Sequence, residues 1–135
     1  MTRGRLLHTE SMRLRWGEMD AMRHLNNVAY FRYFEEARIA WFVSLGVGWG
    51  GEGEGTVLGS IDNRFLVPAL YPADVIVELH AGRVGTASFE LLHRLRDANE
   101  AATVYAEGSA TLVWIDVATG KARPVPDRIR AVLQG

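Results

Sequence analysis

The chain has 135 residues and a formal net charge of −1, with 48% hydrophobic and 23% charged residues. This balance predicts one folded globular domain over residues 1–135 and excludes a disordered chain. The absence of cysteine excludes disulfides and cysteine-ligated metal sites, and the scattered basic residues indicate no nucleic-acid partner.

The amino-terminal segment, MTRGRLLHTESMR, contains only two adjacent leucines as an apolar core. A core this short is not typical of a secretory signal peptide. No apolar run approaches the roughly 18 residues that cross a bilayer as a helix. We therefore expect a cytoplasmic protein with no membrane partner.

The first predicted elements are a strand and a long helix. Apolar and polar residues alternate over residues 10–16, which predicts a strand. From Asn27 the apolar spacing changes to three and four, which predicts a helix of about 18 residues. Asn26 or Asn27 suits its N-cap and Gly46 its end. The apolar face of this helix is expected to hold Tyr30, Phe34, Ala37, Trp41 and Leu45.

The opposite face of this helix is polar. Arg32 can pair with Glu36 one turn further on. Glu35 and Glu36 are expected to form a solvated surface rather than to supply a second catalytic acid. The helix should therefore pack on the core with one face only.

A glycine-rich segment, GVGWGGEGEG, follows the helix over residues 46–55. It contains a formal G-x-G-x-x-G match at Gly46, Gly48 and Gly51. A dinucleotide fingerprint needs a strand before it and a helix after it, whereas here a helix precedes and a strand follows. The segment is therefore interpreted as a loop between helix and strand.

The rest of the chain is predicted to form strands. Apolar patterns separated by short turns indicate strands over residues 56–67, 74–84, 88–97 and 102–116. A short helix over residues 125–134 should start near Pro126. Because the turns are short, the sheet should be mainly antiparallel, and the fold class is α+β.

The connection RWGEMDAMRHLNN, from Arg15 to Asn27, concentrates polar groups between the first strand and the helix. It holds two carboxylates, a histidine, two arginines and two adjacent asparagines. Asp20 precedes a helix N-terminus, where unpaired N–H groups carry partial positive charge. An acid there can act as a nucleophile or general base on a carbonyl that these groups polarise. On the residues alone, a turn-forming aspartate is the commoner role.

The longer stretch RWGEMDAMRHLNNVAYFRYFEEAR resembles the acyl-CoA thioesterases of the 4-hydroxybenzoyl-CoA thioesterase-like branch of the hotdog fold. Glu18 replaces a common aspartate of that family, and Arg23 stands where many members have glycine. The resemblance extends along nearly the whole chain and implies one long central helix wrapped by a curved, mainly antiparallel sheet of about five strands. The positions that match the family motif are Glu18, Asp20, Arg23, His24, Asn26, Asn27 and Tyr30.

The resemblance implies hydrolysis of a fatty or aromatic acyl-CoA to free acid and coenzyme A. Asp20 would be the nucleophile or general base, and the backbone N–H of Asn27 would polarise the thioester carbonyl. His24 would orient Asp20 or the substrate, and Asn26 and Tyr30 would contact the substrate. On the residues alone, the asparagines suit capping, His24 suits a structural hydrogen bond equally well, and Tyr30 suits the core.

No cofactor is expected, because coenzyme A is part of the substrate. His8, His80 and His93 share no metal-ligand spacing, so no metal site is expected either. Arg83 is, with Arg94 and Arg96, a candidate contact for the coenzyme A phosphates.

The resemblance also implies a homodimer or homotetramer with the active site between subunits. The substrate could be carried by coenzyme A or by acyl-carrier protein. Two other functions stay open: an enoyl-CoA hydratase or dehydratase of the same fold, and a non-catalytic acyl-CoA-binding module.

Overall fold

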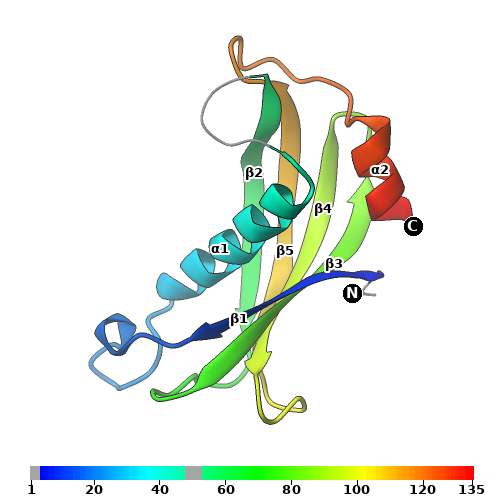
Figure 1. Ribbon diagram of the computed structural model, residues 1–135. Helices are drawn as coiled ribbons and strands as arrows, with labels where there is room; N and C mark the ends of the chain where they lie inside the picture. The colour runs from blue at the N-terminus through cyan, green and yellow to red at the C-terminus, as the bar shows by residue number, and fades with distance from the viewer. Residues whose placement is uncertain (1–3, 48–52) are drawn as a thin grey trace.

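A computed structural model describes residues 4–47 and 53–135, and Figure 1 shows one helix lying across a single curved sheet. The sheet order is β1-β3-β4-β5-β2, and every neighbouring pair is antiparallel. This arrangement is the hotdog fold and confirms the α+β prediction. The elements in chain order are β1 (Leu6–Arg13), the 3-10 turn η1 (Trp16–Glu18), α1 (Ala29–Ser44), β2 (Glu54–Phe65), β3 (Asp74–Val84), β4 (Ser88–Asp97), β5 (Val104–Asp116) and α2 (Asp127–Gln134).

The bounds of β3 and β4 agree with the sequence prediction, but the first strand was placed wrongly. β1 spans residues 6–13, and Trp16 belongs to η1 instead. The chain leaves the sheet after Leu14, whose N–H donates to the Ala73 carbonyl at 3.0 Å. Trp16 is 74% exposed, so its place in the apolar alternation does not reflect burial.

The central helix is shorter than predicted. It has 16 residues and begins at Ala29, so Asn27 lies before it. Gly46 has the predicted stop conformation, with φ +71, a value that side chains disfavour. Of the formal glycine motif, Gly48 and Gly51 lie outside the described residues.

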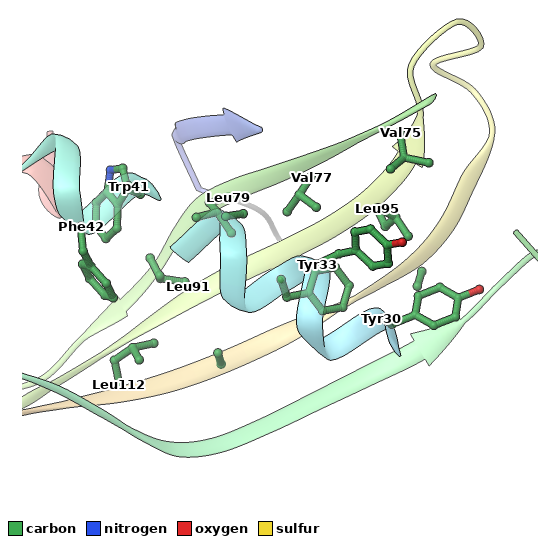
Figure 2. Close-up of a cluster of buried hydrophobic side chains, with 14 of the residues drawn as sticks. Tyr30, Tyr33, Trp41, Phe42, Val75, Val77, Leu79, Leu91, Leu95 and Leu112 are labelled. Atoms are coloured by element: carbon green, nitrogen blue, oxygen red, sulfur yellow. The ribbon is translucent and has the colours of Figure 1, made fainter. Parts of the chain in front are cut away.

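The predicted apolar face of α1 does pack on the sheet. Tyr30, Phe34, Ala37 and Trp41 are buried. Burying one large apolar side chain contributes about 1.5–3 kcal/mol, so this face anchors the helix. Figure 2 shows side chains of the helix facing those of the sheet; the labelled residues are Tyr30, Tyr33, Trp41, Phe42, Val75, Val77, Leu79, Leu91, Leu95 and Leu112.

A buried histidine interrupts this apolar layer. The His93 ring stacks on Phe34, with ring centroids 3.8 Å apart. Its Nε2–H donates to the Asp62 carbonyl at 3.0 Å. Since that nitrogen must carry the proton, neutral His93 keeps a bare lone pair on Nδ1. His93 on β4 reaches Asp62 on β2 by passing Gly108 on the strand between them.

The burial of His93 predicts a loss of stability in mild acid. Burial, and after it the Arg38 charge, lowers the pKa of His93 from 6.5 to about 4. The unfolded chain takes up this proton near pH 6.5 and the folded chain only near pH 4. The contribution of neutral His93 is therefore complete above pH 6.5 and lost as the pH falls toward 4. It corresponds to about 3 kcal/mol of unfolding free energy.

Denaturant unfolding at pH 7 and pH 4 measures this contribution. A His93→Gln variant removes the titrating ring and keeps a polar side chain. Its stability should depend less on pH than that of the parent. An equal pH dependence in both proteins would show that His93 does not carry the effect.

Candidate active site

The Asp20 carboxylate is held by the backbone of its own loop. Oδ1 accepts the N–H of Met22 at 2.9 Å and the N–H of His24 at 3.1 Å. The Asp20 N–H donates to the His24 carbonyl at 2.8 Å, and the Arg23 N–H donates to the Asp20 carbonyl at 2.9 Å. Within the described residues, Oδ2 receives no hydrogen bond. The aspartate thus forms the turn and still presents one oxygen for chemistry.

Glu18 ties this loop to the central helix. Its Oε1 accepts the Tyr33 hydroxyl, and its Oε2 pairs with Arg32 at 3.2 Å. The Arg15 N–H also donates to the Tyr33 hydroxyl at 3.2 Å. Burial, and next the Glu18 carboxylate, raises the pKa of Tyr33 to about 12. Arg32 therefore pairs with Glu18, and the predicted pair with Glu36 is wrong.

The two asparagines have different positions at the start of α1. The Asn26 side chain accepts the N–H of Val28 at 3.0 Å, and its carbonyl accepts the N–H of Ala29 at 2.9 Å. Val28 occupies the cap position. Asn27 makes no capping bond, and in the described part of the chain its N–H has no acceptor. That N–H is free to receive a carbonyl oxygen from a ligand.

Removing the Asn26 side chain should weaken the start of α1. Asn26→Ala leaves the Val28 N–H without its acceptor, a loss that typically costs about 1 kcal/mol. Asn27→Ala should leave the stability nearly unchanged, because that side chain caps nothing. Thermal unfolding of both variants compares them. A larger loss in the Asn27 variant would contradict this assignment of the cap.

Asp20 borders two hollows on the surface. The larger, ≈540 Å³, is lined by Trp16, Gly17, Met19, Asp20, Arg23 and Tyr71. The smaller, ≈150 Å³, is lined by Asp20, His24, Leu25, Asn27, Tyr30 and residues 65–68. The smaller hollow thus brings together four of the predicted site residues. Asn26 lines a third hollow instead, beside Glu18 and Arg32.

Tyr30 belongs both to the core and to the wall of the smaller hollow. It is 2% exposed, and its ring meets Phe65 edge-on at 5.0 Å. Burial raises the pKa of Tyr30, and the Asp20 charge raises it further. Its hydroxyl therefore stays protonated beside Asp20 and can donate a hydrogen bond.

The sequence analysis missed the far wall of this hollow. Residues 65–71 follow β2 and pack beside the Asp20 loop: the Leu25 N–H donates to the Ala69 carbonyl at 2.8 Å, and His24 pairs with Leu70. The only local signal was Pro68, which marked the end of a strand. That the segment lies against a loop some forty residues earlier depends on the tertiary fold.

Two of the three candidate phosphate contacts are already engaged. Arg94 pairs with Glu107 at 3.3 Å, and Arg96 pairs with Glu78 at 2.7 Å. Within residues 4–47 and 53–135, no group of three or more histidine or acidic side chains is suited to a metal ion. The same residues contain no helix long and apolar enough to cross a membrane.

Comparison with known proteins gives consistent results. Residues 14–133 match the model of the thioesterase-like superfamily. The structure of the PA2801 protein from Pseudomonas aeruginosa, named as a candidate thioesterase, is 47% identical, with a TM-score of 0.90 over 94% of this chain and 98% of that one. A candidate acyl-CoA thioesterase from Xanthomonas campestris is 33% identical, with a TM-score of 0.76 over 83% of this chain and 95% of that one.

Similarity also reaches a protein known from sequence alone. The YsmA protein of Bacillus subtilis strain 168 is 29% identical over 81% of this chain and 73% of its own length. The superfamily match covers nearly the whole fold and includes the Asp20 loop, α1 and all strands after it. The chain therefore belongs to the thioesterase-like superfamily.

Proposed function

We propose that this thioester hydrolase acts on an acyl-CoA, with Asp20 as the nucleophile or general base. One observation supports the proposal most directly. The free oxygen of Asp20 and the unbonded N–H of Asn27 belong to residues that line the same small hollow. An acid and a carbonyl-polarising donor at one place are what hydrolysis of a thioester requires.

In this mechanism the thioester carbonyl accepts a hydrogen bond from the Asn27 N–H. The positive end of α1 further stabilises negative charge on that oxygen as it develops. Asp20 then either attacks the carbonyl carbon or removes a proton from an attacking water molecule. In the first case the carbon–sulfur bond breaks, coenzyme A leaves as a thiolate, and water hydrolyses the resulting anhydride. In the second case water adds directly, and the same bond breaks.

A thiol-release screen over short, medium, long and aromatic acyl-CoAs tests the proposed function. We expect hydrolysis of at least one class. A parallel assay of enoyl-CoA hydration addresses the hydratase alternative, since Asp20 and His24 share the small hollow. Hydration without thiol release would favour the hydratase. Binding without either reaction would favour a non-catalytic acyl-CoA-binding module.

We also propose that the protein assembles through β2. This strand lies at one edge of the sheet, so its outer backbone groups are available for pairing. Val57, Leu58 and Phe65 on the strand are each at least 45% exposed, and Phe65 also lines the small hollow. A partner at this edge would complete the site. Light scattering is expected to give at least a dimer, and a species of 15.0 kDa at micromolar concentration would contradict this.

A further inference from the structure

Arg23 has an unusual backbone conformation within the Asp20 loop. Its φ is 65, and among the described residues it is the only non-glycine residue with a positive φ. Side chains disfavour this region, and glycine occupies it without strain. An arginine here needs a reason beyond the shape of the turn, because glycine would form the same turn more readily.

The Arg23 side chain is also without a partner. Other arginines of this chain are paired, such as Arg32 with Glu18 and Arg64 with Glu107. Arg23 makes no side-chain hydrogen bond or ion pair to any residue that the structure describes. Its N–H is bonded to the Asp20 carbonyl, so the backbone that carries the free guanidinium is fixed beside the acid.

The surroundings of Arg23 resemble a binding site. It lines the larger hollow together with Asp20, Trp16 and Tyr71. The two aromatic side chains are 74% and 43% exposed, which leaves their surfaces available to a ligand. A volume of ≈540 Å³ is within the range of small-molecule sites, whereas ≈150 Å³ holds only a few atoms.

The position of Asp20 between the two hollows suggests how a thioester is divided. The carbonyl would enter the smaller hollow, beside Asn27, and a longer part of the substrate would occupy the larger one. An anionic group in the larger hollow is repelled by Asp20. A guanidinium in the same hollow offsets that repulsion and offers a planar set of donors to carboxylate or phosphate.

We infer that Arg23 is a substrate-binding residue that pairs with an anionic group of the thioester, in the hollow bordered by Trp16 and Tyr71. The inference rests on the proposed function, because it takes the ligand to be a thioester. The anionic group is a carboxylate on the acyl part or a phosphate on the carrier part. Both are bound by the same chemistry.

Three probes separate these sources: butyryl-CoA, succinyl-CoA and S-butyryl pantetheine. The first carries phosphates only, the second carries phosphates and an acyl carboxylate, and the third carries neither. Binding is measured by calorimetry in an Asp20→Asn background, which keeps the thioesters intact. Thiol release is measured separately with Asp20 present. Binding that depends on Arg23 without any thiol release would contradict the proposed function alone.

Arg23→Gln should weaken binding about tenfold for the probes that carry the recognised anion. If phosphate is recognised, both coenzyme A thioesters lose affinity. If carboxylate is recognised, only succinyl-CoA does. S-butyryl pantetheine should be unaffected in either case, and where thiol release occurs, KM should rise while kcat stays within about twofold.

Arg23→Gly separates binding from structure. Glycine accepts the positive φ, so the melting temperature should not fall, while affinity should fall as in Arg23→Gln. Arg123→Gln is the matched control: it loses the same charge, but Arg123 pairs with Asp116 at the opposite end of the sheet.

Four results would overturn the inference. They are unchanged affinity for all three probes, an equal loss for all three, a loss as large in the Arg123 control, or no binding of any probe.

Discussion

Replacing Asp20 by asparagine is expected to lower thioester turnover by a factor of about 100 or more. The substitution keeps the size of the side chain and removes its negative charge. The amide oxygen can still accept the N–H groups of Met22 and His24, so the turn should survive. The residual rate should come from carbonyl polarisation by the Asn27 N–H, which the substitution leaves in place.

Steady-state thiol release with the best acyl-CoA substrate measures this effect, and a melting curve shows that the variant is folded. Asp74→Asn is a matched control, because Asp74 is an exposed acid whose 3.8 Å partner, Arg13, lies on β1. Asn27→Ala should keep nearly the parent rate, since the proposed donor is its backbone. If a folded Asp20→Asn protein turns over at the parent rate, the loop is only a turn.

Replacing Gly108 by alanine is expected to destabilise the fold by about 3 kcal/mol. An alanine Cβ at this position would lie 2.2 Å from the Asp62 carbonyl oxygen and 2.8 Å from the Asn63 Cα. Both atoms belong to the β2 backbone, so relief requires the strand to move. The same carbonyl accepts the His93 Nε2–H, and moving it would leave a buried donor unpaired.

Gly59→Ala provides the comparison for this substitution. Gly59 lies on β2, the strand that faces Gly108, and a Cβ there would meet the Val113 side chain at 3.3 Å, a contact that small shifts relieve. Denaturant unfolding at pH 7 should show a much larger loss for Gly108→Ala. Similar losses in the two variants would mean that the close approach of β2 and the His93 hydrogen bond contribute little.

Local sequence pattern was sufficient for most of the secondary structure. The alternation in residues 74–84 and 88–97 predicted β3 and β4 with their observed bounds, because each side of a strand meets a constant environment along its length. The spacing of Tyr30, Phe34 and Trp41 likewise predicted the buried face of α1. The motif around Asp20 also drew attention to residues that the fold places at one hollow.

Local pattern misled where a side chain depends on a distant neighbour. Trp16 continued the apolar alternation, yet it is exposed because the chain turns away from the sheet after Leu14. Arg32 had a suitable partner one helical turn away, but Glu18 is held against α1 by Tyr33 and binds it instead. A fixed, partly buried carboxylate competes better than a mobile exposed one.

The sequence by itself determined the elements, the buried face of the central helix and the loop that holds the candidate acid. Only the tertiary structure decided which segment forms the other wall of the hollow, since residues 65–71 reach the Asp20 loop through the pairing of Leu25 and Ala69. It also decided that Asn26 caps α1, and that Arg23 stands unpaired beside Asp20. Periodicity records the average environment of an element, whereas these contacts depend on where two distant backbones meet.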